Sequence, residues 1–273
     1  MTPPLPSLPN DAEATRATLH AYAHAVAALP RAHALPHPMW WHISLEVRPN
    51  GLVTDSLALP DGGAAQVRMD PRTSMIVFET SGGATRSFPM NAGLTATEIG
   101  NALIAAAAEF GLAGDYDRTK FENDDPRPYV ANDALGLFQA LVSVEGVLAI
   151  RRSRIDGDVG PIQLWPHNFD LAFEWFGTRM VSTGDMSESS KAPAQINFGF
   201  YPAGDAYFYS NPWPFEAREL LTVALPDGAE WHADGWEGSV LPYAAVIGES
   251  DGQARVLDYA RAVFDTASPG LTG

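Results

Sequence analysis

Apolar and polar residues recur along the chain with a period that changes several times, and four stretches follow the period of an α-helix. In these stretches the apolar residues are three or four positions apart, as on the buried face of a helix. Residues suited to helix N-termini precede the stretches, and Thr95 with Glu98 predicts a capping box. Residues suited to helix C-termini follow them, and Pro30 is the predicted stop of the first helix. The pattern predicts helices over residues 10–29, 95–110, 132–152 and 250–268.

Between these helices the pattern changes to a two-residue alternation that is rich in β-branched and aromatic residues. It predicts strands over residues 41–48, 52–59, 64–69, 74–79, 169–176, 195–201, 206–210 and 220–225. Turn-forming residues such as Pro49-Asn50-Gly51 and Asp61-Gly62-Gly63 separate the first four strands at the short spacings of hairpins. Antiparallel meanders therefore fit this chain better than parallel βαβ units.

A tryptophan-histidine motif occurs twice, as WWHISLEV over residues 40–47 and as WPHNFDL over residues 165–171. Each copy follows a predicted helix and precedes several strands and a second helix. The pattern favours an α+β fold of two approximately repeated units, each an antiparallel sheet flanked by helices. The repeat-like halves span about residues 10–114 and 131–268, and an acidic, proline-bearing linker over residues 115–130 joins them.

In the first copy of the motif, strand alternation places Trp41 on an apolar face. His42, Ser44 and Glu46 then share the opposite, polar face. A polar strand face is either a solvated surface or the floor of a cleft. Trp41 and Ser44 are therefore candidates for ligand binding, and His42 and Glu46 are candidates for chemistry.

The second copy repeats this chemistry, with His167 beside Trp165 and with Asp170 on the polar face of its strand. A histidine next to tryptophan is most often a half-buried structural residue. The pairs His42 with Glu46 and His167 with Asp170 are nevertheless the best acid-base candidates in the chain. Imidazole titrates near neutral pH, and a carboxylate can orient it.

Residues 198–213 carry an unusual density of aromatic side chains. Tyrosine and tryptophan combine a flat apolar surface with a polar tip, which suits stacking on planar ligands and equally suits a β-sheet core. Tyr201 and Tyr209 are the residues of this run that we expect to reach a pocket. With Trp41, Ser44 and Trp165 they complete the predicted ligand-binding set.

The chain has 33 acidic and 17 basic residues, and its formal charge of −16 repels phosphate backbones and anionic lipid surfaces. We expect neither nucleic acid nor a membrane as a partner. The absence of cysteine excludes disulfides and sulfur-based metal sites. No apolar stretch approaches the roughly 20 residues of a membrane span, and no signal peptide precedes the first helix. We expect a cytoplasmic protein, and the sequence sets neither a cofactor nor an oligomeric state.

Two further groups of residues have a simpler interpretation. His20 and His24 have the spacing of metal ligands on a helix, but they lie opposite its apolar stripe. We expect them to face solvent, and we predict no metal site. The cluster Arg151, Arg152 and Arg154 ends a predicted helix, where cations interact favourably with the helix dipole. An anion site is the alternative interpretation of this cluster.

Several specific strings occur in one order along the chain: WWHISL at 40–45, PNGL at 49–52, PIQLWPHNFDLA at 161–172, GFYP at 199–202, AYFYS at 206–210 and LPY at 241–243. Over roughly residues 36–265 the chain resembles a bacterial family catalogued as domain of unknown function 5996. The resemblance implies one family-wide unit, so that residues 1–273 form a single compact unit. It supplies no catalytic residues. The chain departs from the family pattern between Val181 and Ala194, where it carries a small polar loop.

Three functions are compatible with these patterns. We expect a soluble small-molecule-binding protein whose cleft lies between the two α+β units and is lined by aromatic, histidine and carboxylate side chains. The first alternative is a hydrolase or isomerase that uses a histidine-carboxylate pair as its acid-base group. The second alternative is an interaction scaffold, which the absence of standard nucleotide, esterase and zinc-protease motifs favours.

Overall fold

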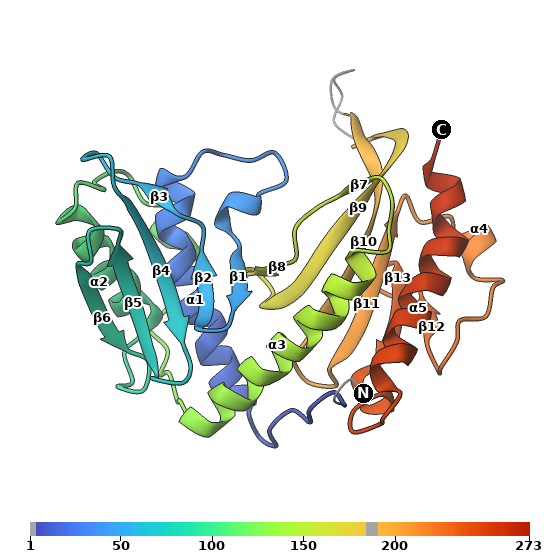
Figure 1. Cartoon of the computed structure of the whole chain (residues 1–273), viewed down its shortest axis with the longest axis horizontal. Coiled ribbons are helices and arrows are strands. Elements are labelled where there is room, and N and C mark those ends of the chain that lie inside the picture. Colours follow the sequence, from blue (N-terminus) through green and yellow to red (C-terminus); the bar gives the residue numbers. More distant parts are fainter. Residues whose placement is uncertain (1–3, 184–190) are drawn as a thin grey trace. The chain divides into compact units, whose positions relative to one another are not determined.

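The structure is a computed structural model that describes residues 4–183 and 191–273. It combines helices with antiparallel strands, which confirms the predicted α+β class (Figure 1). The polar loop expected between Val181 and Ala194 lies largely outside the described residues. Contacts divide the chain into two compact units. Unit 1 contains the described residues of Met1–Ser7, Ser143–Ile162 and Leu171–Gly273, and unit 2 contains Leu8–Val142 and Gln163–Asp170.

Unit 2 consists of two helices that lie on one face of a sheet (Figure 1). The helices are α1 (Glu13–His33) and α2 (Ala96–Ala108), and the short 3₁₀ helices are η1 (Trp41–Ile43) and η2 (Arg118–Lys120). The strands are β1 (Leu45–Arg48), β2 (Gly51–Thr54), β3 (Leu57–Ala58), β4 (Ala64–Asp70), β5 (Met75–Thr80), β6 (Thr85–Pro89) and β8 (Gln163–Trp165). The order is β8-β1-β2-β4-β5-β6, every pair is antiparallel, and β3 pairs with β4.

Helix α1 buries the predicted apolar stripe, including Leu19 and Tyr22. The Tyr22 hydroxyl donates to the carbonyl of Leu94 at 2.6 Å, and burial raises the pKa of this tyrosine to about 12. The predicted stop at Pro30 is wrong, because the helix continues to His33. A proline this close to the C-terminus removes only one of the last backbone hydrogen bonds.

Helix α2 begins with the capping box that the sequence predicted. The Glu98 backbone N–H donates to Thr95 Oγ1 at 3.1 Å, and the Thr95 backbone N–H donates to Glu98 Oε2 at 2.7 Å. Two backbone donors that the helix itself leaves unpaired are thereby satisfied. The start of this helix is therefore fixed by local sequence.

The strand predicted over residues 41–48 begins only at Leu45. The Ile43 and Ser44 backbone N–H groups donate to the carbonyls of Trp40 and Trp41, and these bonds close the turns of η1. Trp40 has a positive φ of 60°, which turns the chain into this 3₁₀ helix. The prediction that His42 and Ser44 share a strand face with Glu46 is therefore wrong.

Unit 1 is also built on antiparallel strands (Figure 1). Its strands are β7 (Asp158–Val159), β9 (Asp170–Ser182), β10 (Lys191–Tyr201), β11 (Tyr207–Trp213), β12 (Glu230–His232) and β13 (Gly238–Pro242), in the order β12-β13-β11-β10-β9, with β7 paired to β9. Its helical segments are α4 (Ala217–Leu220), α5 (Gly252–Ala267), η3 (Tyr243–Ala245) and η4 (Ser268–Leu271). The strand predicted over residues 220–225 is wrong, since α4 and a turn occupy that segment.

Helix α3 (Ala131–Arg152) was predicted almost to the residue. Among the described residues it is the one helix that is long and apolar enough to cross a membrane, judged by length and composition alone. The expectation that no stretch approaches this length is therefore wrong. The residues Leu137, Leu141, Val144 and Leu148 are buried at helical spacing, as in a core helix.

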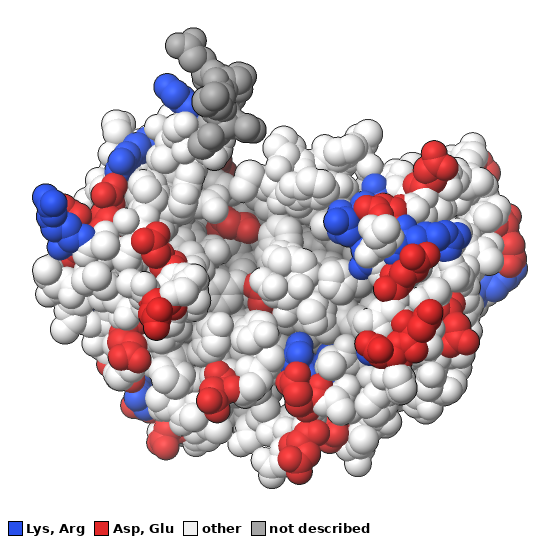
Figure 2. All heavy atoms as spheres, turned by 180° about the vertical axis from the view of Figure 1, so that it is seen from behind, with Lys and Arg blue, Asp and Glu red and all other residues white. Residues whose placement is uncertain are grey.

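Acidic side chains are spread over the surface visible in Figure 2, in keeping with the formal charge of −16.

Candidate functional site

The structure places most of the predicted site residues in unit 2. These are Trp41, His42, Ser44, Glu46, Trp165, His167 and Asp170, whereas Tyr201 and Tyr209 belong to unit 1. The two tryptophan-histidine motifs thus lie in one unit, where β1 pairs with β8 through Leu45 and Leu164. Trp41 opens a 3₁₀ helix, but Trp165 ends a strand. The local structures of the two copies differ, and the proposed duplication is not confirmed.

His42 is buried, and its ring stacks on Trp40 at 5.7 Å between centroids. Its Nδ1 accepts a hydrogen bond from the backbone N–H of His37 at 3.1 Å, so in the neutral ring the proton is on Nε2. Burial, Arg31 and His37 lower the pKa of His42. This histidine is held as a neutral, packed side chain.

Neither Glu46, the predicted partner of His42, nor Ser44 orients this histidine. Glu46 accepts a hydrogen bond from Arg48 Nε at 2.7 Å, two residues further along β1. The Ser44 hydroxyl donates to the carbonyl of Trp41 at 2.7 Å. Both side chains serve local structure at the start of the sheet.

His167 is exposed, and its ring meets Trp165 edge-on at 5.8 Å. Asp170 is buried at the first position of β9, directly after Phe169, whose φ is 57°. Within the described residues, neither His42 nor His167 forms a hydrogen bond to a carboxylate. The geometry therefore gives no support to the predicted histidine-carboxylate pairs.

Tyr201 and Tyr209 lie on one face of the unit 1 sheet, as the register of β10 and β11 requires. Both are half-buried. The Tyr209 ring lies over Gly199, where an added Cβ would come within 2.4 Å of Tyr209 Cζ. The glycine thus makes room for the aromatic ring to lie flat on the sheet.

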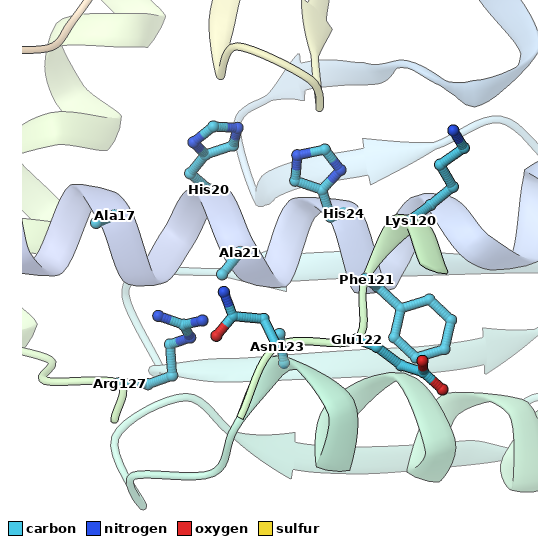
Figure 3. Close-up of a pocket in the computed structure, with 10 residues that line it drawn as sticks. Ala17, His20, Ala21, His24, Lys120, Phe121, Glu122, Asn123 and Arg127 are labelled. Carbon is cyan, nitrogen blue, oxygen red and sulfur yellow. The ribbon is translucent and has the colours of Figure 1, made fainter. Parts of the chain in front are cut away.

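Unit 2 contains a pocket beside helix α1, with a cavity volume of about 330 Å³. We call it the α1 pocket. Figure 3 shows His20 and His24 along one edge of α1, with Lys120 beyond His24, and Arg127 and Asn123 along the opposite edge. The lining residues are Ala17, His20, Ala21, His24, Ala96, Lys120, Phe121, Glu122, Asn123 and Arg127.

One stripe of α1 forms the helical wall of this pocket. Residues 17, 20, 21 and 24 are three or four positions apart and therefore share a helix face. Ala17 and Ala21 have no side chain beyond Cβ and leave space beside the two imidazoles. The prediction that His20 and His24 simply face solvent is wrong, because both are half-buried and line the α1 pocket.

The segment after η2 forms another wall and is anchored on α2. The Phe121 ring is buried against Gly100, where an added Cβ would lie 2.3 Å from Phe121 Cε2. The Asn123 backbone N–H donates to Thr97 Oγ1 at 2.9 Å. These contacts hold Lys120 and Asn123 at the pocket.

Arg127 is positioned by the chain that follows it. Thr18 Oγ1 donates to the carbonyl of Pro128 at 2.7 Å, and the Val130 backbone N–H donates to Thr15 Oγ1 at 3.1 Å. The Nε and Nη2 atoms of Arg127 are buried and have no hydrogen-bond partner among the described residues. These two nitrogens form one side of the guanidinium, the side that binds a carboxylate or phosphate through two parallel hydrogen bonds.

The electrostatics of the α1 pocket disfavour additional positive charge. Burial, followed by the nearby His20, His167, Arg31 and Lys120, lowers the pKa of His24 to about 4. Burial and Arg16 also lower the pKa of His20. The rings stack at 5.0 Å, and His20 Nε2 carries a proton, because it contacts the carbonyl of His167 at 3.2 Å. Both imidazoles are neutral at pH 7.

This combination of neutral imidazoles and two cations, Lys120 and Arg127, against one carboxylate, Glu122, suits an anion. Within the described part of the chain, no group of three histidine, aspartate or glutamate side chains is placed to hold a metal ion. Imidazole N–H, amide, ammonium and guanidinium groups are all hydrogen-bond donors. The sequence signal for this site is the string over residues 17–24, in which alanine and histidine each recur after four positions.

Comparison with known proteins places the chain in a family without assigning it an activity. No curated protein and no solved structure matches it. The family model that matches covers residues 3–270, nearly the whole chain. The chain therefore belongs to DUF5996, a family of unknown function.

Proposed function

We propose that this protein is a cytoplasmic small-molecule-binding protein, and that its ligand is a small anion bound in the α1 pocket. The ligand carries a carboxylate or phosphate group. The observation that carries the proposal is the side of Arg127 formed by Nε and Nη2, which is buried and has no acceptor among the described residues. The proposal keeps the binding function expected from the sequence and assigns it to other residues.

The energetics favour an anion at this place. A buried donor without an acceptor costs about 1–3 kcal/mol, and hydrogen bonds to charged groups contribute about 1.5–3 kcal/mol each. Both nitrogens of Arg127 are covered in the free protein, so the guanidinium turns towards the pocket as the ligand enters. An oxyanion that then accepts from Arg127 removes the cost and gains the bonds. Lys120 adds a second positive charge, and the one N–H of neutral His24 can donate to the anion, whereas the N–H of neutral His20 already donates to the carbonyl of His167.

The size of the pocket limits the ligand. About 330 Å³ is close to the lower end of ligand pockets, which span roughly 300–1,000 Å³. A small metabolite fits this volume better than a dinucleotide-sized cofactor. The enzymatic alternative has less support, since no carboxylate in the described part of the chain is hydrogen-bonded to His42 or His167. The predicted aromatic cleft, with Trp41, Trp165, Tyr201 and Tyr209, stays a prediction.

The first test is native mass spectrometry of the purified protein, followed by calorimetric titration with inorganic phosphate and with citrate. We expect a co-purified small anion or saturable binding of at least one probe. Arg127→Met should weaken binding about tenfold or more, which corresponds to about 1.4 kcal/mol. Arg127→Lys should bind the probes little better than Arg127→Met, because lysine lacks the planar pair of donors.

Arg218→Met is the matched control, because it removes one exposed arginine from α4 in unit 1. It should bind both probes as the wild type does. Wild-type affinity in Arg127→Met would contradict the proposal. A protein that carries no anion and binds neither probe would contradict it as well.

A further inference from the structure

A second cavity lies within unit 1 and is separate in sequence from the α1 pocket. Its volume is about 270 Å³. We call it the arginine cavity, because Arg151, Arg154 and Arg261 line it together with Leu257, Asp258, Phe264 and Asp265. Three arginines and two aspartates leave one formal positive charge at this place, in a chain whose total is −16.

Arg151 is the unusual member of this group. Its side chain is only 5% exposed, and Nε and Nη2 have no hydrogen-bond partner among the described residues. The guanidinium carbon lies over the rings of Phe198 and Phe264 at 5.5 and 5.1 Å. Aromatic faces attract the cation, but they accept no conventional hydrogen bond from its N–H groups. The two rings therefore attract the Arg151 cation, but its buried Nε–H and Nη2–H groups have no hydrogen-bond acceptor among the described residues.

The helix dipole favours a cation at the end of α3, but it supplies no acceptor to Arg151. Arg151 and Arg152 both lie in the last turn of the helix, where a cation interacts favourably with the dipole. Among the described residues, Arg152 donates to the carbonyls of Gly160 and Val159, at 2.6 and 3.3 Å, whereas no carbonyl accepts a hydrogen bond from Arg151. The dipole interpretation of the arginine cluster stays a prediction, and it leaves Nε and Nη2 of Arg151 without an acceptor.

The carboxylates of the cavity do not neutralise Arg151. Asp258 pairs with Arg261 at 2.9 Å. Asp265 lies close enough to influence the pKa of Arg151, but no ion pair joins them. Burial lowers the pKa of Arg151 to about 10, so the guanidinium still carries its charge at pH 7.

We propose that the arginine cavity binds the oxyanion group of a second small ligand, a carboxylate or a phosphate, through Nε and Nη2 of Arg151. Both nitrogens are covered in the free protein, so the guanidinium turns towards the cavity as the ligand enters. Arg154 and Arg261 supply further positive charge at the cavity wall, while Leu257 and Phe264 supply an apolar wall for the body of the ligand.

The test is NMR titration of the full chain, observing the arginine Nε–H signals, with inorganic phosphate and with benzoate as probes. The Arg151 signal, assigned by its loss in Arg151→Lys, should shift saturably with at least one probe. Stronger binding of phosphate would indicate a phosphate ester, and stronger binding of benzoate would indicate an apolar carboxylate. No saturable shift with either probe would overturn the proposal.

Variants separate this site from the α1 pocket. Arg151→Lys keeps the charge but lacks the paired donors, and it should weaken binding of the probe at least about tenfold, as followed through the Nε–H signal of Arg154 at the same cavity. Arg154→Met, at the cavity wall, should weaken binding of the probe severalfold. Because Arg154 is exposed, this variant still tests the cavity if replacement of the buried Arg151 prevents folding. Arg218→Met and Arg127→Met should leave this binding unchanged. Wild-type affinity in both Arg151→Lys and Arg154→Met would refute the arginine cavity without bearing on the α1 pocket.

Discussion

Replacement of His24 by glutamine tests the electrostatic description of the α1 pocket. Burial lowers the pKa of His24 from 6.5 to about 4 in the folded protein. In the unfolded chain the same imidazole titrates near its ordinary value. Between these two pKa values the unfolded state binds more protons, so the free energy of unfolding falls as the pH decreases through this range. Above pH 6.5 the full stability is present.

The magnitude follows from the difference between the two pKa values. Because one pKa unit corresponds to about 1.4 kcal/mol, the decrease from 6.5 to about 4 represents roughly 3 kcal/mol at low pH. The imidazole is half-buried, and solvent screening reduces this figure by about half. We therefore expect His24 to account for about 1–2 kcal/mol of the stability that is lost between pH 7.5 and pH 4.5.

Urea denaturation of the wild type and of His24→Gln at both pH values measures this contribution. The variant should lose about 1–2 kcal/mol less than the wild type on acidification. Any change in the free energy of unfolding that the substitution causes at pH 7.5 cancels, because each protein is compared with itself at the two pH values. Lys120→Met removes a cation that lowers the pKa of His24, and an NMR titration should show a higher pKa for His24 in that variant. Equal losses in the wild type and His24→Gln would refute the reasoning.

Three further predictions concern the framework and the ligand. Gly100→Ala should destabilise the protein by about 1–3 kcal/mol in urea denaturation, because the new Cβ meets the Phe121 ring. Gly146→Ala, with no atom within 4 Å of the added Cβ, should stabilise it by about 0.5–1 kcal/mol, and equal effects would contradict this packing. Thr95→Ala should cost about 1 kcal/mol in thermal denaturation, and an unchanged midpoint would contradict the capping box. Sulfate, whose charge is constant from pH 7.5 to 5.5, should bind the α1 pocket more tightly at the lower pH, because a bound anion favours protonated His24; calorimetry showing no pH dependence would contradict this.

Local sequence signals predicted the helices well and the strands less evenly. The capping box at Thr95 and the apolar period of residues 132–152 depend on neighbours a few positions apart, which a sequence displays directly. The strands β12 and β13 were missed, because each has five residues or fewer and their register is set by pairing across the sheet. Short strands of this kind take their structure from partners that are distant in sequence.

The candidate sites were harder to predict for a related reason. Alternation along residues 41–48 predicted a polar strand face, but the left-handed backbone of Trp40 starts a 3₁₀ helix and removes that face. His20 and His24 were assigned to solvent, because the sequence of α1 shows one apolar stripe and the two histidines lie opposite it. The segment that covers them arrives from residues 120–127, and its position depends on the packing of Phe121 on Gly100. Nothing in the sequence near α1 reports that contact.

The two proposed sites share one feature that composition alone makes unexpected. Acidic residues outnumber basic residues by 33 to 17, so carboxylate partners for arginine are abundant. Arg68 and Arg255 do pair with Asp70 and Asp227. Arg127 and Arg151 each bury the Nε and Nη2 side, and nothing in residues 4–183 and 191–273 accepts a hydrogen bond from it.

A buried donor without an acceptor costs about 1–3 kcal/mol, a large part of the stability of a typical domain. Two aromatic rings attract the Arg151 cation, but among the described residues no acceptor offsets that cost at Arg127 or Arg151. An anionic ligand does, because it supplies the missing acceptors at the same pair of nitrogens in both places. A double variant, Arg127→Met with Arg151→Met, should therefore lose anion binding at both sites and yet lose little stability in the absence of ligand. A double variant that unfolds, while each single variant binds as the wild type does, would show instead that both arginines serve the fold.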